Sequence, residues 1–149
     1  MTHGLRVADL HYAYGAKTAL DGISFEVPPG RFCALLGPNG AGKSTLFALL
    51  TRLLVARQGQ VQLAGIDLAA DPGAALRHLG IVFQQPTLDM DLTVQQNLRY
   101  FAALHGIGRR EADTRIAASL AQLDMAERAD ERVRNLNGGH RRRTELARA

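Results

Sequence analysis

A glycine-rich segment beginning at Gly37 has the residue types and spacing that phosphate binding requires. It runs Gly37, Pro38, Asn39, Gly40, Ala41, Gly42, Lys43, Ser44 and Thr45. Glycine lets backbone amides approach anionic oxygens closely, because no side chain intrudes. Lys43 would place a positive charge against the β and γ phosphates, and the Ser44 hydroxyl would bind magnesium. The pattern predicts a P-loop that binds a nucleoside triphosphate, with ATP and Mg²⁺ as the expected cofactors.

The sequence on both sides of the loop predicts the elements that would position it. Residues 32–36 are a continuous apolar run, which predicts a strand buried on both faces in a mostly parallel sheet. Leucines at helical spacing predict a helix over residues 44–54, whose N-terminal dipole favours an anion. Lys43 is one of only two lysines against sixteen arginines. Its presence in the loop is therefore not a by-product of composition.

Other parts of the first half of the chain are expected to be rich in strands. Alternating apolar residues predict strands at 5–10 and 23–27, joined by a loop with turns at Gly15 and at Asp21 and Gly22. A hairpin-like pair is expected within 61–68, and a further strand at 81–83.

The second half has helical spacing. It predicts helices over 93–105 and 109–123, which Gly106 and Gly108 separate. We therefore expect an α/β fold in one domain over 1–149. Its parts are a strand-rich P-loop core at 1–86, a helical subdomain at 87–135, and a loop and helix at 136–149.

Composition is that of an ordinary globular protein, with 149 residues and 46% hydrophobic side chains. Its apolar runs are much shorter than the roughly 18 residues of a membrane-spanning helix. The first residues lack the pattern of a secretory signal, so a cytoplasmic location is expected. The single cysteine, Cys33, lies in an apolar run and is expected to be a core residue rather than part of a disulfide or metal site.

The formal net charge of +4 is concentrated in residues 99–149, which carry eleven basic and seven acidic side chains. A basic balance is typical of proteins that bind nucleic acid or anionic membranes. Here acidic residues are interleaved with the arginines, which favours a solvated helical surface. We expect no direct contact with nucleic acid.

Two later segments add further motifs to the P-loop, namely LGIVFQQ at 79–85 and NLNGGHRRRTELARA at 135–149. Together with the P-loop they resemble the nucleotide-binding domain of an ABC transporter over the whole chain. The resemblance implies a P-loop NTPase fold of the ABC ATPase type, with an antiparallel N-terminal part, an inserted helical subdomain and a parallel core sheet, which we expect to be incomplete because the sequence stops at Ala149. It implies that Tyr14 stacks on adenine, although Tyr12 is an alternative and strand-end packing is another. It also implies that Gln84, rather than Gln85, reaches magnesium and the γ phosphate. Lys43 and Gln84 are then the expected catalytic residues.

The signature loop of that family, usually Leu-Ser-Gly-Gly-Gln, reads LNGGH here at 136–140. By resemblance, Asn137, Gly138, Gly139 and His140 would bind the γ phosphate held by an opposing subunit. Asparagine is as good an N-cap as serine, and its amide also donates to phosphate. His140 would form a hydrogen bond if neutral, would attract phosphate if protonated, or would simply be an exposed helix residue. The basic run at 141–143 has a nucleic-acid alternative, but this helix is often basic in the family.

The resemblance implies an ATPase subunit of an exporter-type transporter. It would work as a homodimer with a separate transmembrane permease, on the inner face of the cell membrane. Alternatives are a soluble ABC ATPase that acts on nucleic acid or ribosomes, and a non-catalytic fragment. The LNGGH variant is also similar to ATP-binding subunits encoded with pyrroloquinoline-quinone-dependent alcohol dehydrogenase systems.

Hydrolysis in this family needs two carboxylates on a strand beyond the signature helix, and a histidine further on. The sequence ends at Ala149, inside that helix, so we expect an N-terminal portion of a larger ATPase from which the general base is missing. Residues 120–124 superficially resemble the strand but continue a helical pattern. The 149-residue chain is expected to bind ATP weakly if at all, and to hydrolyse none.

Overall fold

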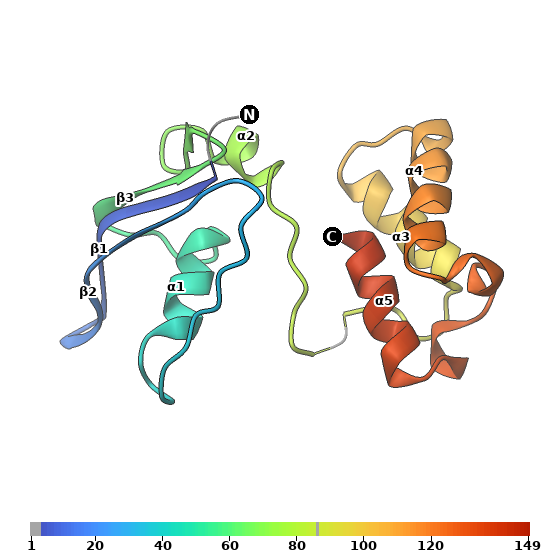
Figure 1. The fold of residues 1–149 in the computed structure, drawn as a ribbon, viewed down its shortest axis with the longest axis horizontal. Helices are drawn as coiled ribbons and strands as arrows, with labels where there is room; N and C mark the ends of the chain where they lie inside the picture. The colour runs from blue at the N-terminus through green and yellow to red at the C-terminus, as the bar shows by residue number, and fades with distance from the viewer. Residues whose placement is uncertain (1–3, 86) are drawn as a thin grey trace. The chain divides into compact units, whose positions relative to one another are not determined.

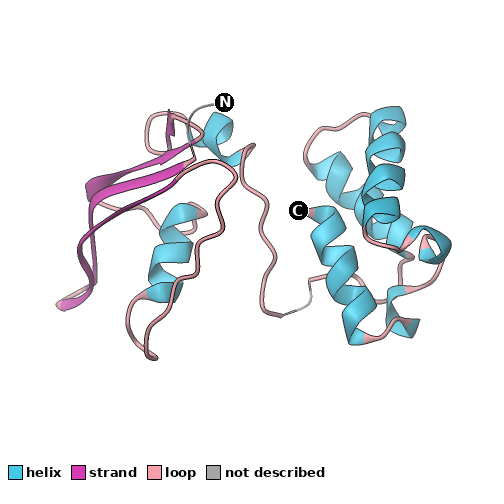
Figure 2. Cartoon of the chain, in the orientation of Figure 1, coloured by secondary structure: helices cyan, strands magenta, loops and turns pink. Residues whose placement is uncertain are grey.

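The computed structural model describes residues 4–85 and 87–149. These residues form two units, which divide between Leu79 and Gly80. Strands in the described residues lie only in the first unit, and the second is built from helices and short turns (Figure 2). The three-part subdivision drawn from the sequence stays a prediction.

An antiparallel sheet forms one layer of the first unit. The strands are β1 (Leu5–Tyr14), β2 (Lys17–Val27), β3 (Gln58–Leu63) and β4 (Ile66–Asp67), in the order β2-β1-β3-β4 (Figure 1). All their pairings are antiparallel. The β3–β4 hairpin and the antiparallel start of the chain are as predicted.

The first two strands are longer than predicted. The turn between them takes only Gly15 and Ala16, while Asp21 and Gly22 lie inside β2. Gly22 has a positive φ of 65°, and its N–H donates to Nδ1 of His11 on the neighbouring strand at 3.2 Å. A glycine in this conformation can accommodate a bulge without ending a strand. The apparent turn signal is therefore an irregularity in a continuing ladder.

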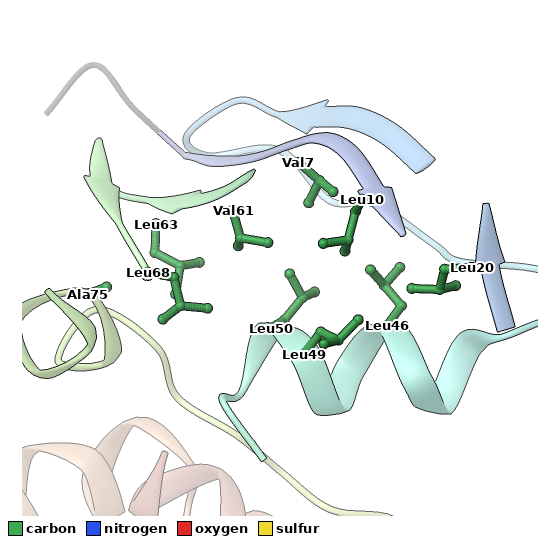
Figure 3. Packing of buried hydrophobic residues seen from close by; sticks show 10 residues of the cluster. All are labelled: Val7, Leu10, Leu20, Leu46, Leu49, Leu50, Val61, Leu63, Leu68 and Ala75. Atoms are coloured by element: carbon green, nitrogen blue, oxygen red, sulfur yellow. The ribbon is translucent and has the colours of Figure 1, made fainter. Parts of the chain in front are cut away.

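The core of the first unit lies between this sheet and helix α1 (Lys43–Leu50). Leu46, Leu49 and Leu50 point from α1 toward the sheet, where they meet apolar side chains of the strands (Figure 3). The buried strand residues are Val7, Leu10, Leu20, Val61 and Leu63. Helix α2 (Pro72–Leu76) extends the cluster with Ala75, and the Asp71 carboxylate caps its first turn by accepting from the Ala74 N–H at 2.9 Å. The apolar face of α1 therefore holds the helix against the sheet, together with the P-loop that leads into it.

Helix α1 is shorter than the predicted span of 44–54. It ends at Leu50, and Arg52 has a left-handed φ of 62°, which an α-helix cannot continue through. The Leu54 N–H instead donates to the Ala48 carbonyl at 3.0 Å. The leucine pattern thus runs past the helix into its terminating turn.

The predicted strands at 32–36 and 81–83 are wrong, because neither segment is a strand in the structure. A strand needs a neighbour to satisfy its backbone N–H and C=O groups, and no described segment pairs with these two. The side chains of Phe32 and Leu36 are 95% and 88% exposed. Cys33 is likewise exposed, so its predicted place in a core is also wrong. The apolar pattern was real, but apolar residues alone do not make a strand.

The second unit is a small helical cluster around the buried side chains of Val94, Leu98, Ile116, Leu120 and Met125. Its helices are α3 (Val94–Leu104), α4 (Arg109–Gln122) and α5 (Gly138–Arg148), with short 3-10 turns at Ala126–Arg128 and Val133–Asn135. The predicted helices over 93–105 and 109–123 are confirmed to within one residue. Thr93 and Gln96 form a reciprocal capping box at the start of α3, which fixes that boundary. Among the described residues, no helix has the length and apolar character needed to cross a membrane.

An ion pair joins α3 to α4, and it makes the stability of this unit depend on pH. Nε of Arg99 donates to Oδ1 of Asp113 at 2.6 Å, and this hydrogen bond lowers the pKa of Asp113. A carboxyl whose folded pKa is lowered adds stability above its unfolded pKa of about 3.9, and that contribution is lost as pH falls through the lower folded value. We expect the unfolding temperature of the parent chain to fall as the pH drops below about 4, and we expect D113N to lack this fall. Glu127→Gln, an exposed carboxyl on the same unit, is the matched control. Equal acid sensitivity of D113N and the parent would contradict the assignment.

Candidate functional site

The P-loop of the structure is an open turn that leads into the first turn of α1. Gly40 and Gly42 have positive φ values of 85° and 86°, which side-chain-bearing residues rarely adopt. A side chain at Gly40 would meet nothing within 4 Å, so open space adjoins the backbone there. At Gly42 it would lie 2.5 Å from the Ala19 carbonyl oxygen. One glycine keeps the loop open, and the other lets it pack directly on β2.

Lys43 holds the loop together in its present shape. Its ammonium donates to the carbonyl oxygens of Gly37 and Pro38, at 2.6 Å in each case. An ammonium group has three N–H donors, so one remains for an anionic ligand. The same side chain can therefore brace the loop and contact a phosphate.

A hollow of about 290 Å³ lies along the loop and the start of α1. Its polar lining includes Asn39, Lys43, Ser44 and Thr45, with Gly40 and Gly42. The Ser44 side chain is exposed and Thr45 is buried. Backbone amides, an ammonium and two hydroxyls at a helix N-terminus are the groups that bind phosphate and its magnesium. The residues that line the hollow therefore fit the phosphates of a nucleoside triphosphate.

Tyr14 also lines this hollow. Its ring packs edge-on against Tyr12, with centroids 5.0 Å apart, and its hydroxyl lies 3.4 Å from Oγ1 of Thr45. Tyr14 is half exposed, so part of its surface is accessible to solvent. Its role in stacking on adenine stays a prediction.

Three residues that the sequence did not single out also line the hollow, namely Lys17, Thr18 and Ala19 at the start of β2. They lie there because the tight turn after Tyr14 brings β2 back beside β1 and under the loop. Their only sequence signal is nearness to Tyr14, which becomes informative once the turn is known to be short.

The signature loop and Gln84 belong to the second unit. Asn137 is the N-cap of α5, where its Oδ1 accepts from the His140 N–H at 2.8 Å. Gly138 and Gly139 form the exposed first turn, and His140 is partly exposed. Asn137 thus does the capping that its residue type predicts. Gly138 and Gly139 are exposed at this helix start, where free backbone N–H groups and the helix dipole favour an anion.

Gln84 and Gln85 lie in an exposed irregular segment after Phe83. Several side chains of α5 bind this segment. The buried Glu145 carboxylate accepts from the Thr87 N–H at 2.9 Å, and Arg142 donates to the Phe83 carbonyl oxygen. The structure thus places the segment against the helix that begins at the signature loop.

Comparison with known proteins identifies the family of this chain. The family model described as ABC transporter matches residues 20–149. The chain belongs to this family. The α/β fold of a P-loop NTPase of the ABC ATPase type, expected from the sequence, is confirmed by solved structures as well. The ABC protein cbiO1 of Clostridium perfringens, part of the transporter complex cbiONQ, has a TM-score of 0.86 at 27% identity, covering 99% of this chain and 61% of that one.

Curated ABC proteins with similar sequences carry ATP-binding names. The daunorubicin resistance ATP-binding protein DrrA3 of Streptomyces coeruleorubidus is 40% identical over 134 residues, which are 90% of this chain and 42% of that protein. The Nod factor export ATP-binding protein I of Paraburkholderia xenovorans is 38% identical over 137 residues, which are 92% and 45% of the two chains. The chain thus spans about half the length of the curated relatives it matches.

Proposed function

We propose that this chain carries the ATP-binding part of a subunit that hydrolyses ATP to drive an ABC exporter. The observation that carries the proposal is Lys43, held at 2.6 Å from two P-loop carbonyls beside the exposed Ser44 at an open polar hollow. In this proposal Lys43 contacts the β and γ phosphates, and the amides of residues 37–45 surround them. Tyr14 stacks on the adenine, from the strand end that adjoins the loop.

Magnesium fits the same set of residues. The Ser44 hydroxyl and phosphate oxygens are the hard oxygen ligands that Mg²⁺ prefers, and the Gln84 side-chain oxygen would be a further one. Mg²⁺ would neutralise charge on the phosphates during transfer to water. The chain's own residues supply positioning, and the expectation that these 149 residues do not turn over ATP stays a prediction.

The second half of the proposal is a dimer with composite sites. A P-loop surrounds the phosphates from one side, and the exposed N-terminus of α5 offers amides for the γ phosphate of a partner's nucleotide. In a head-to-tail pair of subunits, each Asn137–Gly139 turn would face the P-loop of the other. Asn137 would cap its helix and also donate from its amide nitrogen, while His140 would lie at the edge of the site.

Export through a separate membrane permease is proposed from the relatives, whose names include drug resistance and Nod factor export. The chain would then act in the cytoplasm, on the inner face of the membrane.

A cross-linking experiment tests the composite site. Two separately tagged variants are made after Cys33→Ser, one with N39C and the other with G138C. Asn39 lines the phosphate hollow, and a side chain at Gly138 would meet nothing within 4 Å. Mixed under mild oxidation, they should form a disulfide-linked pair carrying both tags, several times faster with Mg-ATP than without nucleotide.

Each variant alone is the control, since neither contains both partners of the proposed site. No mixed pair at saturating Mg-ATP would contradict the composite site. A mixed pair that forms equally without nucleotide would indicate random collision.

A further inference from the structure

The unusual feature outside the phosphate hollow is a buried carboxylate in α5. The Glu145 side chain lies almost entirely inside the second unit, although it is charged and far along the helix from the signature turn. Buried charges are costly unless each oxygen has a partner. Both oxygens of Glu145 are bound, one to the Thr87 N–H at 2.9 Å and the other to Nη1 of Arg142 at 3.2 Å.

Glu145 is one of three side chains of α5 that bind the segment around Gln84. Arg142 also donates to the Phe83 carbonyl oxygen, and Nη1 of Arg148 donates to the Thr87 hydroxyl. Arg148 is fixed in turn by the Phe101 ring, whose centroid lies 4.4 Å from the guanidinium carbon. Three side chains on successive turns of α5 therefore hold residues on both sides of Gln84 and Gln85.

We propose that Glu145, with Arg142 and Arg148, positions the Gln84 segment on the signature helix, so that Gln84 moves with the Asn137 turn as one body. These are positioning residues, since they touch neither phosphate nor metal in the proposed site. The inference rests on the proposed function for the role of Gln84, but the attachment itself does not. A nucleotide that draws in the signature turn would then bring the segment of Gln84 with it.

The attachment is tested on the 149-residue chain without nucleotide, by the exchange of single backbone amides. E145M fills the buried volume but removes the acceptor for the Thr87 N–H, while E145Q keeps an acceptor oxygen. We expect Thr87 exchange to become about tenfold or more faster in E145M and to be largely restored in E145Q. Amides within α3 and α4 report whether the unit remains folded.

A second pair covers the case in which E145M unfolds the unit. Arg142 and Arg143 are adjacent, but only Arg142 contacts Phe83 and Glu145, whereas Arg143 reaches the Leu123 carbonyl. R142A should speed exchange at Thr87, and R143A should not. Equal exchange in these two variants, or equal protection in E145M and E145Q with the unit folded, would overturn the proposal.

The positioning role is separated from a merely structural one by a double-mutant cycle on Mg-ATP affinity. R142A should weaken binding about three- to tenfold in the parent and have no further effect in Q84A, because its influence acts through Gln84. An equal loss in both backgrounds would overturn the positioning role. If the parent chain shows no nucleotide response at all, the proposed function fails and the role that rests on it is overturned, while the exchange results still decide the attachment.

Discussion

Replacing Lys43 by alanine should lower the affinity of the chain for Mg-ATP by about ten- to a hundredfold. A hydrogen bond to a charged group is worth about 1.5–3 kcal/mol, and Lys43 has one N–H left for the phosphates. The alanine also removes both bonds to the loop carbonyls, so part of the loss will come from a looser loop. Titration followed by chemical shifts in the backbone of residues 37–45 measures the change even where the parent binds weakly.

Arg6→Ala is the matched control for this titration. Arg6 lies on β1 in the same unit and is exposed, and its removal changes the net charge by the same amount. If long-range attraction for the anionic nucleotide explained the loss, both variants would weaken binding alike. A K43A chain that binds Mg-ATP as well as the parent would contradict the assignment of the P-loop.

Replacing Gly42 by alanine should destabilise the first unit by about 3 kcal/mol, mainly because of where the loop meets the sheet. A left-handed φ costs a side-chain-bearing residue about 1–2 kcal/mol. At Gly42 the added methyl would also lie 2.5 Å from the Ala19 carbonyl oxygen and 2.7 Å from Cδ2 of Leu20. Relieving these contacts requires the start of α1 to move away from β2, which disturbs the core around Leu46.

Gly40→Ala separates the two contributions. Gly40 has nearly the same φ, but its methyl would enter open space. It should therefore cost only the conformational strain, about 1 kcal/mol after the smaller entropy of the unfolded chain is counted. The unfolding temperature of the first unit should fall by roughly 4–8 °C in G40A and by at least twice as much in G42A. Equal shifts would mean that the close packing on β2 contributes nothing.

Features set by short stretches of sequence were predictable. The P-loop glycines, the helix over 109–123 and the capping by Asn137 depend on local backbone chemistry, and the structure has them at the expected residues. The β3–β4 hairpin is similarly local, since its turn follows directly from Ala64 and Gly65. For these elements the residue type and its neighbours carry nearly all the information.

Features that depend on distant partners were not predictable. The run at 32–36 has the composition of a buried strand, but pairing is decided by another segment, and no described one pairs with it. The irregularity of β1 at Asp9, with its φ of 47°, is stabilised by the Ser24 hydroxyl and by Gln58 from other strands. Likewise, the lining of the hollow by Lys17 depends on a turn two residues long. Each of these features depends on the position of a distant segment, which the local sequence does not specify.

The exposed Cys33 gives the molecule a use that a buried thiol would not have. It is the only cysteine in the sequence and lies four residues before Gly37. A maleimide dye would therefore attach to each molecule once, at Cys33. Access to solvent makes the thiol available to the reagent without unfolding the chain. The protein thus carries a native labelling handle beside its phosphate-binding loop.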